Sequence, residues 1–429
     1  MNKKFIAIAV LSFAFFACRQ DVLLEHPDDN GFYSSSFRLD EIFDKFWQGM
    51  NCYYVYWDIE SKGYWSYVYK EYRPKFEQLG LIVPEEENGV VIPNANVITA
   101  YKYFKDMTAP LHDGHLSIEF NPYWFSKSYP SDPVNDKFKI NPNYNRVLSR
   151  AGISGSAVFL SDWSDIPLDK NCNFWQNIIS QNFTNHGSYK TSQFRFALGT
   201  RTHSQGGTIV YIYFSQFSIR ETLNSEGGSG QFTSLWEKFY EKLQLTDLRG
   251  VIIDVRGNGG GANADIPLIL GPMLKNRILI AETRVKKSLA PLEYKPWAPY
   301  YLSPSSAGMV NRDLPVVLIC NDFSISCAEL LTMAVKQMNN GYVIGRKSFG
   351  ALGPRVSDIS PIKTLGGSFS GGPFWVNVIQ AGLQTRGPDK RNYDGIGITP
   401  DKIVELNASD FYNNGTDPQL DAAIKQIDP

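Results

Sequence analysis

Three short apolar runs in the second half of the chain limit most strongly what it can fold into. They are Gly250–Val255 (GVIIDV), Pro315–Cys320 (PVVLIC) and Gly341–Gly345 (GYVIG). Runs of this kind are typical of strands that are buried on both faces, as in a parallel sheet. Apolar residues with helical spacing lie between the second and third runs, from Cys327 to Met338. Strand–helix–strand order at this length predicts a right-handed βαβ crossover and an α/β fold.

The same kind of pattern extends upstream to about residue 207. Thr208–Phe214 (TIVYIYF) predicts a strand, and helical spacing between Phe232 and Leu243 predicts a helix after it. Lys402–Glu405 is expected to form a final strand. We therefore assign residues 207–429 to one α/β domain.

A different pattern precedes this domain. Apolar residues between Leu39 and Met50 recur at i, i+3, i+4 and i+7, which predicts an amphipathic helix, and a second helix is expected between Val97 and Met107. We assign residues 36–108 to a small N-terminal helical domain. The following stretch, 109–206, shows weak periodicity and is treated as a linking region.

The N-terminus resembles a targeting segment rather than a folded element. Two lysines precede an apolar stretch from Phe5 to Ala17, which is too short to span a membrane. Cys18 follows the small residue Ala17, as in a bacterial lipoprotein signal. The pattern predicts a signal peptide over residues 1–17, lipidation of Cys18, a tether over residues 18–35 and a place in the bacterial cell envelope, on the outer membrane. The alternative is a cleaved secretory signal with an incidental cysteine.

The charge balance excludes one class of partner. The chain has 42 Lys and Arg residues and 43 Asp and Glu residues, so it lacks the basic excess that drives nucleic-acid binding. Its four further cysteines are in no CxxC pair and lie near no histidine at ligand spacing, so they predict no zinc site, and no disulfide is specified. These cysteines are Cys52, Cys172, Cys320 and Cys327.

A glycine-rich segment, Asp254–Ala262 (DVRGNGGGA), directly follows a predicted buried strand, and three interpretations of it stay open. Gly257, Gly259 and Ala262 fit a dinucleotide fingerprint, with Glu282 following 20 residues later. Alternatively, N–H groups of the loop stabilise a developing oxyanion, or the segment is only a tight turn. Proline residues soon after the segment count against a helix that would bind pyrophosphate.

A serine, Ser326, stands at the start of the predicted helix that follows the PVVLIC strand. The unpaired N–H groups and the positive dipole end of a helix N-terminus favour an oxyanion there, and the N–H of Cys327 is a natural donor. The negative charge of Glu329 in the first turn interacts favourably with the same dipole. The competing interpretation is an N-cap serine, the commonest role of serine at such a position.

Two of the five histidines, His112 and His115, lie together in the segment LHDGHL. A serine hydroxyl needs a base within hydrogen-bond reach, and histidine titrates near neutrality. Further along the chain, Asp394 in YDGIGITPD supplies a carboxylate of the kind that orients an imidazole. The alternative for both segments is a plain turn.

Taken together, these segments resemble peptidase family S41, which comprises the C-terminal processing proteases and the tricorn-like proteases. GVIIDVRGNGGG is similar to the strand and glycine loop of that family, SCAE to its nucleophile turn, and VIGRKSFGALG and DGIGITPD to its later segments. The resemblance covers roughly residues 207–405, with LHDGHL upstream of them. It implies a ClpP/crotonase-like α/β core, which here accompanies the N-terminal helical domain.

One departure from the family pattern decides which base the resemblance implies. The processing proteases have a lysine 25 residues beyond the serine, and in this chain that position is Ala351. Lys347 is too far from it along an extended strand to substitute. Tricorn-like members use an upstream histidine, and LHDGHL resembles the motif that carries it. The resemblance therefore implies Ser326 as nucleophile, His115 as general base and Asp394 as the supporting carboxylate.

Gly114 is a second departure, because the tricorn protease has a serine just before its histidine. Because of this difference, the sequence does not specify which groups orient the base. The implied oxyanion donors are the N–H groups of Gly259 or Gly260 and of Cys327.

The sequence thus predicts a secreted, lipid-anchored serine-type peptidase that needs no metal and no organic cofactor. Its partners would be a peptide or protein substrate and, through Cys18, a membrane. Asp254 and Arg256 are expected to pair and to brace the glycine loop. Two alternatives remain: a catalytically inactive protein of the same fold that binds a peptide or apolar ligand, and a dinucleotide-dependent oxidoreductase.

Overall fold

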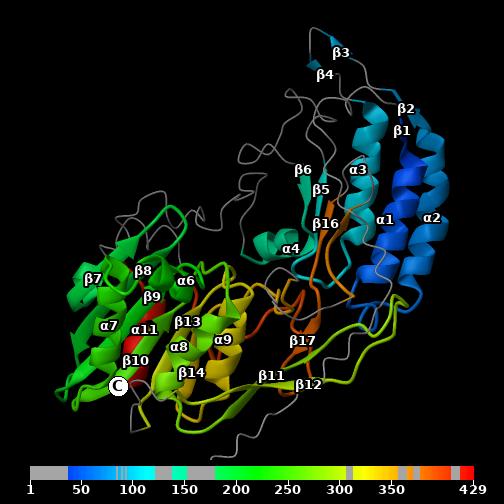
Figure 1. Cartoon of the computed structure of the whole chain (residues 1–429). Coiled ribbons are helices and arrows are strands. Elements are labelled where there is room, and N and C mark those ends of the chain that lie inside the picture. The colour runs from blue at the N-terminus through cyan, green and yellow to red at the C-terminus, as the bar shows by residue number, and fades with distance from the viewer. Residues whose placement is uncertain are drawn as a thin grey trace, which may run out of the picture.

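The computed structural model describes residues 37–83, 86–87, 90–91, 94–120, 138–151, 179–305, 313–355, 365–370, 377–406 and 416–429. The predicted signal peptide, Cys18, the tether and Cys172 lie outside these residues. Figure 1 shows a lobe of long N-terminal helices beside a lobe built on a large sheet. Within the described ranges, no helix has the length and apolar character needed to cross a membrane.

A seven-stranded sheet forms the centre of the α/β lobe. Its order is β18-β14-β13-β10-β9-β8-β7, parallel from β18 to β9 and antiparallel from β9 to β7. The strands are β7 (Thr184–Lys190), β8 (Arg195–Thr202), β9 (Thr208–Phe214), β10 (Leu248–Asp254), β13 (Val316–Cys320), β14 (Gly341–Gly345) and β18 (Lys402–Ile403). The predicted strands fall on β9, β10, β13, β14 and β18, and the α/β fold is confirmed. Strands β7 and β8 come from the stretch treated as a linker and extend one edge of the sheet.

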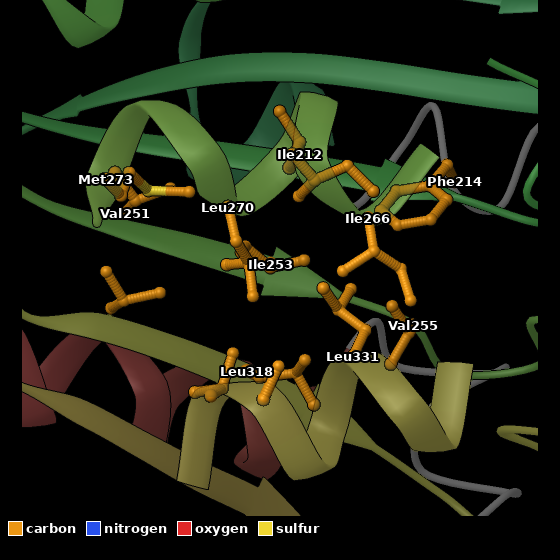
Figure 2. Packing of buried hydrophobic residues seen from close by; sticks show 14 of the residues in the cluster. Ile212, Phe214, Val251, Ile253, Val255, Ile266, Leu270, Met273, Leu318 and Leu331 are labelled. Carbon is orange, nitrogen blue, oxygen red and sulfur yellow. The ribbon is translucent and has the colours of Figure 1, made fainter. Parts of the chain in front are cut away.

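Helices cover both faces of this sheet, which explains why its central strands are apolar throughout. Along β10, Val251 and Ile253 belong to one buried cluster and Ile252 to the cluster on the opposite face. Figure 2 shows Ile253 among the side chains of Leu270 and Leu318. Full burial of such a side chain stabilises the fold by about 1.5–3 kcal/mol.

The first face carries α6 (Ile219–Ser225), α7 (Gln231–Leu243), α8 (Ile266–Leu270) and α9 (Cys327–Lys336), together with the 3₁₀ turns η4 (Asn263–Asp265) and η5 (Gly271–Met273). The second face is covered by α11 (Pro418–Ile427), whose Leu420 and Ile424 pack beneath β9, β10 and β13.

The helical lobe consists of α1 (Leu39–Tyr53), α2 (Tyr64–Leu79) and α3 (Ala95–Thr108). The two helices expected from apolar spacing correspond to α1 and α3, and the Tyr- and Trp-rich stretch between them forms α2. Their core is aromatic: Phe46 meets Phe104 edge to face at 4.9 Å, and Phe43 stacks on Phe76 at 4.8 Å between ring centroids. Asn94 caps α3 by accepting a hydrogen bond from the Asn96 N–H at 2.8 Å.

Smaller sheets join the two lobes. Strands β15 (Phe369–Ser370), β16 (Asn377–Ile379), β5 (Ser117–Phe120) and β6 (Phe138–Ile140) form one sheet, and β12 (Ala298–Leu302), β11 (Ile278–Arg284) and β17 (Gln384–Arg386) form another. Two short pairs, β1 (Phe37–Arg38) with β2 (Leu81–Ile82) and β3 (Glu86–Glu87) with β4 (Val90–Val91), and helix α4 (Pro142–Ala151) complete the described elements. Because β5 pairs with β16, the LHDGHL segment just before β5 is held against the C-terminal half of the chain.

Candidate active site

Ser326 lies at the turn from β13 into α9, in an unusual backbone conformation. Its φ is 56° and its ψ is −115°, whereas an N-cap residue normally has extended dihedrals. Among the described residues, only Lys390 is another non-glycine residue with positive φ. Such strain persists only where surrounding structure enforces it, and it clusters at functional sites. The geometry therefore favours the nucleophile interpretation of Ser326 over that of a plain helix cap.

The glycine loop packs directly beside this serine. An ideal Cβ on Gly260 would lie 2.7 Å from the Ser326 Cβ and 3.2 Å from the Cys327 nitrogen, so only glycine allows this approach. The prediction that Gly259 or Gly260 supplies an oxyanion donor does not fit this conformation. The Gly259 N–H donates to the Ser215 carbonyl at 3.1 Å, and the Gly260 N–H donates to Asn258 Oδ1 at 2.9 Å.

The next residue, Gly261, adopts φ +132°, and its N–H has no acceptor among the described residues. Its carbonyl accepts from the Cys327 thiol at 2.7 Å, which ties the end of the loop to the first turn of α9. Gly261 is thus the loop residue whose N–H remains available near the nucleophile turn.

The predicted brace of the glycine loop is confirmed. Arg256, 1% exposed, donates to both carboxylate oxygens of Asp254 and to both of Asp417, at 2.6 to 3.1 Å. Tyr211 adds its hydroxyl to Asp254 at 2.9 Å. The network fixes the end of β10, and with it the start of the glycine loop.

The dinucleotide interpretation of this loop is wrong. A pyrophosphate site needs a helix that begins at the loop, but here η4 has three residues and α8 has five. Glu282, the expected ribose ligand, is instead paired with Arg386 at 2.7 Å and with Lys390. Neither half of the fingerprint is arranged to hold a nucleotide.

The LHDGHL segment packs onto the loop that follows β14. An ideal Cβ on Gly114 would lie 1.8 Å from the Gly350 carbonyl oxygen and 2.5 Å from the Ala351 Cα. Asp113, fully buried, accepts from the His115 N–H through Oδ1 and from the Ala381 N–H through Oδ2, both at 2.8 Å. Asp113 therefore links the backbone of His115, the predicted base, to the backbone of Ala381.

Asp394 lies next to the predicted base, as expected from the sequence. One carboxylate oxygen of Asp113, one of Asp394 and a ring nitrogen of His115 all lie within 4.8 Å of one another. The Asp394 carboxylate is fully buried and accepts from the Gly353 N–H at 3.2 Å. These are also the only His, Cys, Asp or Glu side chains in the described ranges grouped closely enough to hold one metal ion.

Burial shifts both carboxyl groups of this cluster in the same direction. It raises the pKa of Asp113 to about 7, and it raises the pKa of Asp394 well above its ordinary value, with the charge of Asp113 adding to that effect. Two such groups side by side favour a single shared charge near neutral pH.

Sequence reasoning missed three further residues around the base. Asp113 lies inside LHDGHL, and its position two residues before His115 was the available signal. Glu60 accepts from the His112 N–H at 2.9 Å and contacts His112 Nδ1 at 2.9 Å. Tyr56 lies beside Asp394 and against Gly353, and nothing in the local sequence marks either Glu60 or Tyr56.

Comparison with known proteins agrees with this architecture. Residues 208–404 match the model of "Peptidase family S41". The "Tricorn protease homolog" of Saccharolobus solfataricus is 24% identical over 394 residues, covering 86% of this chain and 33% of its own length. The "Tricorn protease" of Thermoplasma acidophilum is 24% identical over 456 residues, covering 94% of this chain and 37% of its own. The chain thus spans about a third of the length of these relatives.

The fold is also found in a solved structure. A crystal structure of a Parabacteroides merdae protein assigned as a peptidase superimposes with a TM-score of 0.59 at 20% identity, over 91% of this chain and 97% of that one. At this identity the likeness shows the fold alone. Because the family match covers the parallel strands of the sheet, the glycine loop and the Ser326 turn, residues 208–404 of this chain belong to peptidase family S41.

Proposed function

We propose that this chain is a serine-type peptidase in which Ser326 attacks a peptide carbonyl and His115 is the general base. The observation that carries the proposal is the contact between the two segments that bear these residues. Gly114, next to His115, packs on Gly350 and Ala351, and the Glu329 carboxylate accepts from the N–H groups of both Ala351 and Ser326. The histidine loop therefore packs on a loop that the Glu329 carboxylate ties to the serine turn, although the two segments are about 200 residues apart in the chain.

The reaction follows the usual course of acyl transfer. His115 takes the hydroxyl proton of Ser326 as its oxygen bonds to the carbonyl carbon, and then gives that proton to the leaving amine. The N–H groups of Cys327 and Gly261 are the donors we assign to the oxyanion, and each such donor is typically worth about 3–4 kcal/mol in the transition state. Water then hydrolyses the acyl-enzyme with the same histidine as base.

The two buried carboxyl groups beside His115 have separate roles in this proposal. Asp113 fixes the backbone of the base through its hydrogen bond to the His115 N–H. Asp394 orients the imidazole and stabilises the imidazolium that forms. In this proposal the pair of carboxyl groups carries one negative charge close to the ring.

A lysine base is not supported by this arrangement. Ala351 occupies the family lysine position and packs in a small apolar cluster with Phe323, Ile325 and Phe349. The aliphatic part of Lys347 lies beside Gly397. We therefore propose histidine, not lysine, as the base.

The proposal is tested on residues 18–429 with a fluorophosphonate probe, which labels activated serines. We expect labelling of the parent chain and none of Ser326→Ala. His115→Ala should lose labelling while circular dichroism shows an unchanged fold. Labelling that persists in Ser326→Ala would contradict the assignment of the nucleophile. No labelling of the parent chain, with saturable binding of a peptide or apolar ligand, would favour the inactive alternative.

We also propose a peptide or protein substrate and a lipid anchor at Cys18 in the bacterial outer membrane. The signal pattern of the first 18 residues supports the anchor. In a bacterial host, the full chain should incorporate labelled palmitate and sediment with membranes, and Cys18→Ser should do neither. Palmitate incorporation into Cys18→Ser would remove the anchor from the proposal.

A further inference from the structure

Glu329 in the first turn of α9 is a fully buried carboxylate with an unusual set of partners. Oε2 accepts from the Ser326 N–H at 3.2 Å and the Ala351 N–H at 2.7 Å. Oε1 accepts from the Ser348 hydroxyl and the Gly350 N–H, both at 2.7 Å. No Lys or Arg of the described residues forms an ion pair with it.

These four hydrogen bonds are more than a helix cap requires. In a capping box, a Glu at this position accepts one backbone N–H at the start of its own helix. Here three of the four donors come from the loop 19 to 22 residues downstream. A buried carboxylate is costly unless it is fully hydrogen-bonded, so Glu329 holds its place only while that loop is docked on α9.

The loop that Glu329 holds is the one on which the base loop rests. Gly114 approaches Gly350 and Ala351 so closely that no side chain fits between them. Asn143 of α4 adds to the same junction by donating to the carbonyls of Phe349 and Gly350, at 3.1 and 3.2 Å. The position of His115 relative to α9 therefore depends on the loop that the Glu329 carboxylate fixes.

The same carboxylate also accepts a hydrogen bond from the backbone of the proposed nucleophile. Ser326 has a φ of 56°, which is strained for a residue with a side chain, and its N–H points to Glu329. Gly260 packs on the other side of this turn. Loss of the Glu329 contact would let the turn relax and move the serine hydroxyl.

We propose that Glu329 is a positioning residue that sets the distance between the Ser326 hydroxyl and the His115 ring, because its carboxylate holds both the Ser326 turn and the loop on which the His115 segment rests. This inference rests on the proposed function. A displacement of about 1 Å between reacting groups can lower a rate by about 10²-fold, so the effect on reactivity should be large.

The test separates positioning from stability by resolving probe labelling into kinact and KI, at a temperature where every variant is folded. Glu329→Gln keeps the shape but replaces one acceptor oxygen by an NH₂ group. We expect kinact to fall on the order of 10- to 100-fold, with KI unchanged within about twofold because probe binding is not affected.

Glu226 provides a matched control far from the site in sequence. Its carboxylate accepts from the N–H groups of Phe232 and Thr233 at the start of α7, at 3.0 and 2.7 Å. Glu226→Gln should lower the melting temperature and leave kinact as in the parent chain.

Ser348→Ala keeps the experiment decisive if Glu329→Gln does not fold. It removes one donor to Oε1 and leaves the Ser326 contact in place. It should lower kinact by a smaller factor than Glu329→Gln. A folded Glu329→Gln with parental kinact would overturn the inference, and so would parental kinact in Ser348→Ala where Glu329→Gln cannot be measured. Labelling that survives Ser326→Ala would instead refute the proposed function itself.

Discussion

Gly114 lies directly against the carbonyl oxygen of Gly350, and an ideal Cβ at position 114 would be only 1.8 Å from that atom. The contact joins the segment that carries the proposed base to the loop that Glu329 ties to the turn of the proposed nucleophile. It also explains why no serine precedes the histidine here, since a hydroxymethyl group cannot fit. In the mechanism that we propose, Asp113 and Asp394, both buried near His115, supply the orienting groups instead.

Gly114→Ala should therefore impair both reactivity and stability. The added methyl group must push the base loop off Gly350, and overpacking of this kind typically costs about 1–3 kcal/mol. A shift of about 1 Å at His115 would reduce probe labelling by about 10²-fold. Labelling rate and chemical denaturation of the same preparation give both quantities.

Gly227 offers the control for this change. It has φ +60°, a conformation that Asn tolerates, and no atom lies within 4 Å of an ideal Cβ. Gly227→Asn should label at the parental rate. Parental labelling in Gly114→Ala as well would show that the contact does not position the base.

Restoring the family lysine should fail to restore a Ser/Lys site. Ala351 is fully buried in an apolar cluster with Tyr144 and Phe349, and its Cα lies where Gly114 approaches. A lysine there would bring an ammonium group into this buried apolar cluster, which is unfavourable. We expect Ala351→Lys to lower the melting temperature and to give no labelling when combined with His115→Ala. Labelling by that double variant would show that lysine can act as the base here.

Much of the fold could be predicted because its central strands are apolar on both faces and its helices repeat apolar residues at helical spacing. β9 and β14 begin and end where their apolar runs do. The strands β7 and β8 on one side of the sheet could not be found, because their pairing partners, not their own pattern, define them. Ser326 could be singled out because it stands directly before a predicted helix and shortly after a predicted strand.

The parts of the site that could not be predicted depend on long-range contacts. Gly259 and Gly260 were predicted to be oxyanion donors, but their N–H groups donate to the Ser215 carbonyl and to Asn258 Oδ1. Glu60 contacts a histidine 52 residues away, which no local motif records. A glycine-rich sequence shows that a backbone can approach a ligand closely, but not which of its N–H groups is already used.

The buried Arg256 network predicts a large effect on stability. Arg256→Met would leave Asp254 and Asp417 buried without their cation, and breaking such a pair usually costs about 3–5 kcal/mol. Urea denaturation should show a loss of this size. The pair of Lys275 with Asp313 is exposed, at 44% and 74%, so Lys275→Met should cost no more than about 1 kcal/mol. Equal losses in the two variants would contradict the assignment.

The raised pKa of Asp113, about 7, predicts a pH dependence of stability with a definite sign. Between about pH 4 and pH 7, the folded protein holds a proton on Asp113 that the unfolded chain has lost, so the free energy of unfolding falls as pH rises, by up to about 1.4 kcal/mol per pH unit. Asp113→Asn removes this contribution, although it weakens the hydrogen bond to His115 or Ala381. The free energy of unfolding of Asp113→Asn, relative to the parent chain, should therefore increase from pH 5 to pH 7.

Glu226 gives a control of opposite sign, because hydrogen bonds from the Phe232 and Thr233 N–H groups outweigh burial and lower its pKa. Its effect on stability lies in the acid range, below the ordinary pKa of a glutamate, and there the parent chain loses stability as pH falls. Between pH 5 and pH 7, Glu226→Gln should thus differ from the parent chain by a nearly constant amount. A constant difference for Asp113→Asn over the same interval would mean that Asp113 is already ionised in the folded protein at pH 5. The shared charge that we assign to Asp113 and Asp394 beside His115 would then be wrong.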